Sequence, residues 1–283
     1  MQSAFSHSSL STFEKCPRHY HFRYVERRPV DTESVEAFVG KRVHEVLERL
    51  YLFVGDGRVP SLERVVWRYH RNWADQFDAV RIRIARSGTE ADQYRAAGER
   101  CLANYYRGHY PFDADETLGL EKPVHFALDA SGGYSVRGII DRLVRARDGT
   151  LEIHDFKTGR RVPRQEELDR DRQLALYELG VRAELGEIGS VRLVWHYVLS
   201  GHVRTSSRTP EQLDALRRET AALIDRIRAE RVFEPRPSVL CGWCEYRDVC
   251  PAFRPAEPPA EPAELAEPAD LEDAALDQQL QLL

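Results

Sequence analysis

The segment 151–156, LEIHDF, constrains the chain most, because it is a predicted β-strand that leads directly into charged residues. Three of its residues are apolar, and Asp-Gly and Thr-Gly turn signals bound it on either side. Asp155 and Lys157 stand two residues apart, so an extended strand places both on one face. Burying either charge without a partner costs several kcal/mol. The folded protein therefore has to provide partners for these two charges if they are buried.

Further predicted strands and helices surround this segment. EKPVHFAL and YSVRGIIDRLVRA are separated by Ser-Gly-Gly and Asp-Gly turns, which predicts a meander of three strands. Helical periodicity marks most of the remaining chain. The predicted elements are helices at 8–25, 38–53 and 61–110, strands at 121–128, 134–146 and 151–156, a helix at 169–185, a strand at 191–199 and a helix at 210–230.

The first predicted helix carries an additional signal at its start. Ser8 or Ser11 can serve as its N-cap, and Ser11 and Glu14 have the spacing of a capping box. We therefore expect the helix to begin near these serines and to run through the CPRHYHF stretch.

The charge of the chain is divided unevenly between a body and a tail. Residues 254–283 hold one basic and eight acidic side chains, which leaves 40 basic and 38 acidic residues, a net charge of +2, in 1–253. A slightly basic body permits nucleic-acid binding without requiring it. The segment 254–277 is rich in Pro, Ala and Glu, a composition typical of an extended, disordered linker.

Several classes of protein lack their signature in this sequence. No run of about 18 apolar residues suggests a membrane span, and the amino terminus has no secretory pattern. No phosphate-binding G-x-x-x-x-G-K-[ST] loop is found, so the chain carries no evident ATP-driven motor. We expect a cytoplasmic protein.

A second carboxylate is predicted to lie beside Asp155. Asp141, in RGIIDRLV, belongs to the neighbouring predicted strand. Two carboxylates on adjacent strands repel each other unless a positive charge lies between them, and their oxygens suit Mg²⁺ or Mn²⁺. An ammonium group at the edge of such a site, that of Lys157, can stabilise a pentacovalent phosphate. These residues are compatible with a hydrolytic centre.

Simpler interpretations of the same residues remain open. Asp155 and Lys157 could form a surface ion pair, which contributes little to stability. Asp141 could pair with Arg142 or Arg137. The scarcity of lysine argues for a special role of Lys157, because the chain otherwise has only three lysines and relies on arginine for positive charge.

Four motifs in fixed order resemble one nuclease family. GKRVHEVLE (40–48), GIIDR (138–142), DFKTG (155–159) and QLALY (173–177) resemble the RecB-like branch of the PD-(D/E)xK nucleases. The resemblance covers about residues 1–253. It implies an α/β fold with a restriction-endonuclease-like core, in which helices flank a mixed central sheet, with a helical insertion at about 58–112.

The resemblance also implies roles for individual residues. His44, Asp141, Asp155 and the backbone carbonyl of Phe156 would bind a divalent metal ion, Mg²⁺ or Mn²⁺. The residues expected to take part in catalysis are Lys157, Asp155, Asp141, Gln173 and Tyr177. Glu121 would be a further acidic residue of the site.

The implied activity is that of a metal-dependent DNA nuclease. The family favours a single-strand-specific exonuclease in DNA repair or replication, associated with the nucleoid. The alternative is a catalytically silent iron–sulfur protein that binds DNA or serves as a clamp-associated scaffold. Taken singly, His44 could be a core histidine, and Gln173 and Tyr177 could be ordinary helix residues.

Four of the five cysteines have the arrangement of a metal centre. CGWCEYRDVC places Cys241, Cys244 and Cys250 in C-x2-C-x5-C spacing, and Cys16 offers a fourth thiolate from the other end of the chain. Spacing alone does not distinguish zinc from an iron–sulfur cluster. The resemblance to nucleases of the AddB and CRISPR-associated kinds implies a 4Fe–4S cluster, with Zn²⁺ as the alternative. Cys101 is expected to be an ordinary buried residue.

Two other segments suggest binding partners. Arginines at helical spacing stand beside tryptophans, a pattern that can bind a single nucleic-acid strand or be a solvated helix face. They are Arg64, Arg68 and Arg71 with Trp67 and Trp73, followed by Arg81, Arg83 and Arg86.

The last residues, QLQLL (279–283), resemble the peptide that docks bacterial proteins on the sliding clamp. Gln279, Leu280, Leu282 and Leu283 would make the contacts, with Leu283 in place of the usual aromatic residue. A chance leucine-rich terminus is the alternative.

Overall fold

The computed structural model describes residues 4–254. Residues 1–3 and 255–283 lie outside the described residues, and with them all but the first residue of the predicted linker and the whole clamp-binding peptide. Its elements follow in the order α1 (His7–Lys15), α2 (Pro17–Tyr20), the π-helical turn η1 (His21–Val25), β1 (Glu33–Ser34), α3 (Val35–Gly55), α4 (Leu62–Gln76), β2 (Ile82–Arg83), α5 (Ala91–His109), β3 (Asp115–Ala127), β4 (Ser135–Ala146), β5 (Leu151–Lys157), α6 (Gln165–Leu168), α7 (Gln173–Leu185), β6 (Val191–Tyr197), β7 (His202–Ser206), α8 (Pro210–Ala229) and the 3-10 turns η2 (Val239–Gly242) and η3 (Arg247–Val249).

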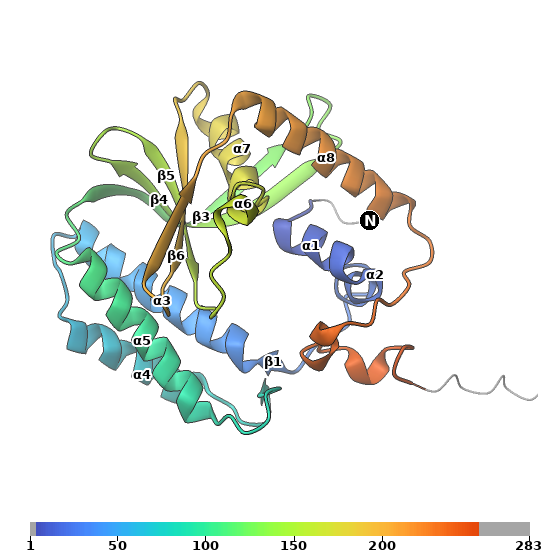
Figure 1. The fold of residues 1–283 in the computed structure, drawn as a ribbon, viewed down its shortest axis with the longest axis horizontal. Helices are drawn as coiled ribbons and strands as arrows, with labels where there is room; N and C mark the ends of the chain where they lie inside the picture. The colour runs from blue at the N-terminus through green and yellow to red at the C-terminus, as the bar shows by residue number, and fades with distance from the viewer. Residues whose placement is uncertain (1–3, 255–283) are drawn as a thin grey trace, which may run out of the picture.

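A five-stranded sheet forms the centre of the molecule (Figure 1). Its strand order is β3-β4-β5-β6-β7, in which β5 and β6 are parallel and the other neighbouring pairs are antiparallel. The parallel pair needs a crossover, and α6 and α7 provide it. Helices on either side of a mixed sheet confirm the predicted α/β class.

Separate hydrophobic clusters hold the helices to the sheet. One joins α3, α4 and α5 to Phe156 on β5, and another joins α7 to Ile153 and the neighbouring strands. Ile153 and Phe156 are an odd number of positions apart, so their side chains leave β5 on opposite faces. A third cluster packs α1 and α8 against the ends of β3 and β4. In Figure 1, α3 runs beneath the sheet with α4 and α5 outside it.

α3 is a long helix because its apolar residues recur at helical spacing. Ser34 caps its first turn by accepting a hydrogen bond from the Ala37 N–H, 3.2 Å away. Val39, Val43 and Val46 are among the residues it buries, and each fully buried valine stabilises the fold by about 1.5–3 kcal/mol. The helix extends past the predicted 38–53 at both ends, and it presents His44 toward the sheet.

The expectation of one helix over 8–25 is wrong. Ser6, not Ser8 or Ser11, is the N-cap of α1, and Ser6 and Ser9 form the capping box by bonding each other's backbone N–H. α1 ends at Lys15 because Cys16, with φ −156°, precedes Pro17 and takes the extended conformation that proline favours before it. α2 and η1 follow as separate turns.

The predicted strand and helix boundaries also need correction. β3 begins at Asp115, six residues before the predicted 121, and contains a register shift between Thr117 and Gly119 that obscures its alternation. The edge strand β7 escaped the sequence analysis because its residues are half-exposed or exposed and show no apolar face. The helical segment 61–110 is divided in two by the loop that contains β2.

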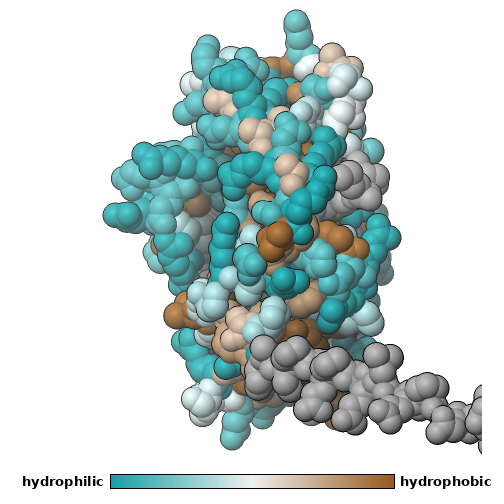
Figure 2. Space-filling view, turned by 90° about the vertical axis from the view of Figure 1, so that its right-hand side faces the viewer, coloured by the Kyte–Doolittle hydropathy of each residue, from teal (hydrophilic) through white to brown (hydrophobic). Residues whose placement is uncertain are grey.

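The face that carries α8 and the cysteine segment is mainly hydrophilic. Figure 2 shows hydrophobic residues there in separate small patches among hydrophilic ones. None of the helices in the described part of the chain is both long and apolar enough to cross a membrane.

Candidate active site

The candidate site lies where β4 and β5 separate. Their pairing ends at Arg142 and His154, so Asp141 and Asp155 stand opposite each other one position further on. Beyond this point the Phe156 N–H has no partner on β4 and donates instead to Asp141 Oδ2, 2.7 Å away. The Asp141 carboxylate therefore accepts the backbone hydrogen bond of β5 at the position where β4 and β5 stop pairing.

Glu121 adds a third carboxyl group beside Asp141 and Asp155. The three form a row across β3, β4 and β5. Leu120 pairs with Arg142 and Lys122 with Ile140, so Glu121 falls opposite Asp141 on β3. Its backbone has φ +42°, a left-handed conformation that a residue with a side chain adopts only at a cost. Burial raises the pKa of Glu121. The site thus contains a strained acidic residue.

Asp141 is the most strongly perturbed acid of this row. Burial raises its pKa to about 7, and the adjacent Asp155 contributes in the same direction. Pairing with Arg142 is ruled out because consecutive strand residues point to opposite faces. Arg142 instead bonds Asp115 at 3.2 Å and lies 3.7 Å from the centre of the Tyr51 ring. The Arg137 side chain makes no ion pair within residues 4–254.

His44 reaches this row from α3. Its Nε2 lies 2.9 Å from the Phe156 carbonyl oxygen, and its Nδ1 lies 3.6 Å from Asp141 Oδ2 and 3.9 Å from Glu121 Oε1. When Nε2–H donates to the carbonyl, the lone pair of Nδ1 faces the two carboxyl groups. The imidazole nitrogen and the two carboxyl groups then point toward one space. Such a group of acceptors is typical of a cation-binding site. His44, Glu121 and Asp141 form one of the two potential metal-binding groups in the described part of the chain.

Asp155 links the row of carboxyl groups to Lys157 and to α7 through hydrogen bonds. Lys157 Nζ lies 3.0 Å from Asp155 Oδ1 and donates to Gln173 Oε1 at 2.8 Å. The Gln173 amide in turn donates to Asp155 Oδ1 at 2.8 Å and to the Tyr177 hydroxyl at 3.4 Å. Because Asp155 is only 3% exposed, the alternative of a solvated surface ion pair is wrong.

The charge of Lys157 follows from these contacts. Burial alone lowers the pKa of its ammonium group, but the carboxylates of Asp155 and Asp141 outweigh burial and leave the pKa above its ordinary value. The side chain is therefore a cation at neutral pH. Gln173 bonds both members of the ion pair and fixes their relative position.

Gly138, in the GIIDR motif, leaves room for the Tyr177 ring. A Cβ atom at Gly138 would lie 2.2 Å from Tyr177 Cε1, far inside van der Waals contact. The absence of a side chain on β4 thus allows α7 to approach the sheet and brings Gln173 within reach of Asp155.

Two residues that the sequence analysis did not single out also lie near this site. Burial lowers the pKa of His7 to about 4, and Arg172 and Lys157 are the next causes. Burial raises the pKa of Asp171, which accepts a hydrogen bond from the Gln173 N–H at 2.9 Å. Neither has a local sequence signal, because α1 and the loop before α7 meet the strands only in the folded chain.

The four predicted cluster cysteines line a single cavity, together with apolar and basic residues; they are Cys16, Cys241, Cys244 and Cys250. None of them forms a disulfide. The Arg236 N–H donates to Cys16 Sγ at 3.4 Å, and the Ser238 N–H donates to Cys241 Sγ at 3.3 Å. Both sulfurs thus accept a backbone hydrogen bond at the edge of this cavity. Cys101 is buried in α5, away from this cavity.

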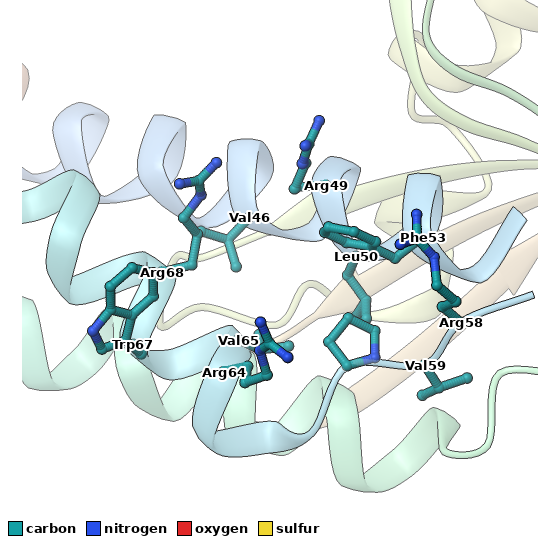
Figure 3. Close-up of a pocket in the computed structure, with 11 residues that line it drawn as sticks. Val46, Arg49, Leu50, Phe53, Arg58, Val59, Arg64, Val65, Trp67 and Arg68 are labelled. Carbon is teal, nitrogen blue, oxygen red and sulfur yellow. The ribbon is translucent and has the colours of Figure 1, made fainter. Parts of the chain in front are cut away.

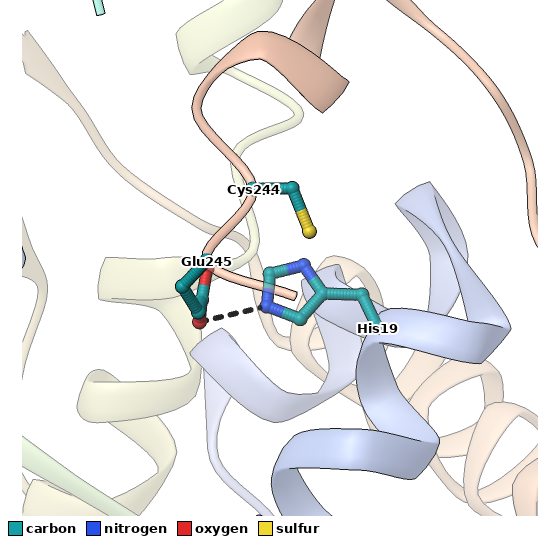
Figure 4. Close-up of side chains that lie close together, drawn as sticks. All are labelled: His19, Cys244 and Glu245. Atoms are coloured by element: carbon teal, nitrogen blue, oxygen red, sulfur yellow. Dashed lines mark hydrogen bonds and ion pairs between the residues drawn. The ribbon is translucent and has the colours of Figure 1, made fainter. Parts of the chain in front are cut away.

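A second potential metal-binding group touches the cysteine cavity. His19, Cys244 and Glu245 bring their ligand atoms within 4.8 Å of one another. Figure 4 shows the Cys244 sulfur pointing toward the His19 ring, while His19 Nε2 bonds Glu245 Oε1 at 3.1 Å. Because Cys244 belongs to both groups, the two arrangements compete for the same sulfur.

The arginine-rich region divides into exposed and paired members. Trp73 packs in the core and cannot stack on a nucleic-acid base, so its predicted role is wrong. Arg71 pairs with Asp75, and Arg83 donates to the Cys244 carbonyl. Arg64 and Arg68, which flank Trp67 on α4, are exposed.

One solved structure shares the fold of this chain, and one family model matches it. A solved structure from Eubacterium rectale, named "Putative exonuclease", is similar with a TM-score of 0.51 at 15% identity, over 91% of this chain and 90% of that one. A structure of SSO0001 has a TM-score of 0.41 at 12% identity, over 90% and 89% of the two chains. No curated protein matches the chain. The model of the PD-(D/E)XK nuclease superfamily matches residues 4–251, almost the whole described chain, and this chain belongs to that superfamily.

Proposed function

We propose that the protein is a metal-dependent deoxyribonuclease that hydrolyses phosphodiester bonds at the fork between β4 and β5. One observation carries the proposal: Glu121, Asp141 and Asp155 stand in a row across three strands, with His44 on one side and Lys157 on the other. Membership of the nuclease superfamily supports the hydrolytic chemistry.

The donor set fits a hard divalent cation. Carboxylate oxygens, a carbonyl oxygen and an imidazole nitrogen suit Mg²⁺ or Mn²⁺. We assign His44, Asp141, Asp155 and the Phe156 carbonyl as ligands, with Glu121 as an additional acid. A cation held by these residues would polarise a phosphoryl oxygen and offset negative charge on it.

Lys157 contributes a fixed positive charge to the reaction. As a cation held by Asp155 and Gln173, it stabilises negative charge that develops on the phosphate and orients the attacking water. Gln173 and Tyr177 hold this pair in place from α7, so their contribution is one of position.

Exchange of Lys157 tests the nuclease assignment. Lys157→Ala should reduce Mn²⁺-dependent cleavage of a labelled single strand by about 100-fold or more. Lys122→Ala is the matched control, because Lys122 is also a lysine on the sheet in an ion pair, with Glu184. Equal cleavage by parent and Lys157→Ala would favour the alternative, a catalytically silent DNA-binding scaffold.

We propose that the protein cleaves single-stranded DNA as an exonuclease, because its motifs resemble those of RecB-like nucleases. The test of this proposal is the cleavage of oligonucleotides with either end blocked. Loss of cleavage when one end is blocked identifies an exonuclease and its polarity, while cleavage of a circular single strand would identify an endonuclease.

We further propose that Cys16, Cys241, Cys244 and Cys250 hold a 4Fe–4S cluster, with Zn²⁺ as the alternative. Their position around one cavity, with backbone donors to two sulfurs, supports a thiolate centre. The cluster would join segments more than 200 residues apart and so restrict the unfolded chain. Protein purified without oxygen should contain about four irons per chain, or one zinc for the alternative. Cys16→Ser should lose the metal, and the control Cys101→Ala should keep it.

The sliding clamp is the proposed partner of the carboxy-terminal peptide. This proposal rests on the resemblance of QLQLL, at 279–283, to clamp-docking peptides. A short apolar peptide at the end of a chain can be presented to a partner groove. Deletion of 278–283 should abolish retention by immobilised clamp and leave cleavage unchanged, whereas unchanged retention would contradict the assignment.

A further inference from the structure

A groove between α3 and α4 gathers four arginines, three of which lack acidic partners within the described residues. Its volume is about 400 Å³ (Figure 3). Arg49 and Arg58 contribute from α3 and the loop after it, and Arg64 and Arg68 contribute from α4. None of the residues that line it is acidic. The groove therefore concentrates positive charge on a chain whose net charge is negative.

Three of these arginines are available for a ligand. Within residues 4–254, the side chains of Arg49, Arg64 and Arg68 make no hydrogen bond and no ion pair. Only Arg58 is paired, with Asp56 at 2.9 Å. The groove therefore holds three guanidinium groups whose charge no carboxylate of the described residues offsets.

Aromatic rings lie among these charges. Trp67 is 61% exposed. Trp67 and Arg68 follow Arg64 by three and four residues, so the three side chains share one face of α4. The guanidinium groups of Arg49 and Arg58 each lie 5.1 Å from the centre of the Phe53 ring. In Figure 3, Trp67 lies toward one end of the groove and Phe53 toward the other.

We propose that this groove binds a single strand of nucleic acid, with phosphates on the arginines and an unpaired base stacked on Trp67. This proposal rests on the proposed function and names where the substrate strand is held. Basic grooves with exposed aromatic side chains bind single strands because every base offers a stacking face. The guanidinium fork also matches the geometry of phosphate oxygens.

The groove and the proposed hydrolytic centre share the helix α3. Arg49 follows His44 by five residues on α3, a rise of about 7.5 Å along the helix. The same five residues also turn about 140° around the helix axis, so the groove and His44 lie on different faces of α3, and a bound strand passes around this helix to reach the proposed hydrolytic centre. A duplex keeps its bases paired and stacked, so it cannot offer a base to Trp67, and we expect the single strand to bind more tightly.

The test measures binding without cleavage. Fluorescence anisotropy of a labelled oligothymidylate of about 20 nucleotides, longer than the about 4–16 that one binding fold covers, is recorded in chelator. Arg64→Glu/Arg68→Glu should weaken binding by at least tenfold and reduce the salt slope by about 1.4, the value for two phosphate contacts to a single strand. Trp67→Ala should weaken binding by about 5- to 150-fold.

A matched variant controls for the change in net charge. Arg218 and Arg226 are exposed on α8 and make no ion pair within the described residues, so Arg218→Glu/Arg226→Glu should bind like the parent. Melting temperatures within a few degrees of the parent would establish that each variant is folded.

The outcomes separate this proposal from the nuclease assignment. Equal binding by the groove variant and the α8 variant would overturn the groove proposal, even if Lys157→Ala confirms cleavage at the fork. Equal weakening of binding to duplex and to single strand would also overturn it, as would a preference of the groove for poly-glutamate over oligothymidylate. Loss of strand binding in the groove variant alone would support it, whatever Lys157→Ala shows.

Discussion

The backbone N–H of Phe156 donates to the Asp141 carboxylate at 2.7 Å, at the point where β4 and β5 stop pairing. This contact explains how two strands can separate without leaving a buried donor unsatisfied. It also turns Asp141 toward Asp155 and His44. The same carboxylate thus ends the sheet ladder and begins the proposed metal site.

The raised pKa of Asp141 predicts a stability that depends on pH. Its pKa is about 7 in the folded protein and 3.8 ordinarily, so the contribution of this group to stability is full below about pH 4 and is lost as pH rises through 7. Asp141→Asn removes this ionisation, while the amide oxygen can still accept from the Phe156 N–H. The metal-free variant should exceed the parent in free energy of unfolding by up to about 4 kcal/mol at pH 8.

Urea unfolding in chelator at pH 5 and pH 8 measures this effect. The advantage of Asp141→Asn should be less than half as large at pH 5, where the carboxyl is ionised in the unfolded chain but still protonated in the folded protein. An advantage of the same size at both pH values would contradict the account of Asp141.

The strained backbone of Glu121 predicts a conflict between stability and metal binding. Glycine adopts φ +42° without the clash that a Cβ atom causes, so Glu121→Gly should raise the free energy of unfolding of the metal-free protein by about 1 kcal/mol. It should also weaken Mn²⁺ binding. Glu116→Gly, at an exposed position of β3 without positive φ, should instead lower stability by about 1 kcal/mol. Destabilisation by both variants would argue against strain at Glu121.

The fit between Gly138 and Tyr177 predicts that a single methyl group disturbs the site. Gly138→Ala forces the Tyr177 ring away from β4 and should cost about 1–3 kcal/mol of stability. Because Gln173 lies on the same helix, cleavage activity should fall as well. Gly40→Ala is the control: its Cβ would lie 3.5 Å from Thr158 Oγ1, an ordinary contact, and alanine favours helices over glycine by up to about 1 kcal/mol. Full activity in Gly138→Ala would contradict this packing argument.

Much of this site was predictable because its residues lie in short motifs on regular elements. Strand periodicity predicts that Asp155 and Lys157 share one face, and the structure places Gln173 and Tyr177 beside them from one turn of α7. The sequence gives less weight to Glu121, because its place in the row depends on an irregular backbone that no local pattern encodes.

The features that escaped the sequence analysis depend on contacts between distant segments. His7 lies near Lys157 only because α1 packs beside the sheet, and β7 is an edge strand without an apolar face. The reverse error occurred at Trp73, whose helical spacing with arginines suggested a surface role, whereas tertiary packing buries it. Periodicity reports local structure well, but it does not report which face meets the core when both faces hold large residues.

Anomalous diffraction from crystals soaked in Mn²⁺ tests the central claim most directly. We predict a manganese ion bound to Asp141 and at least one further ligand among His44, Asp155 and the Phe156 carbonyl, with Lys157 beside it. Fully ordered side chains at the fork, with no anomalous peak among them at saturating Mn²⁺, would contradict the proposed hydrolytic centre.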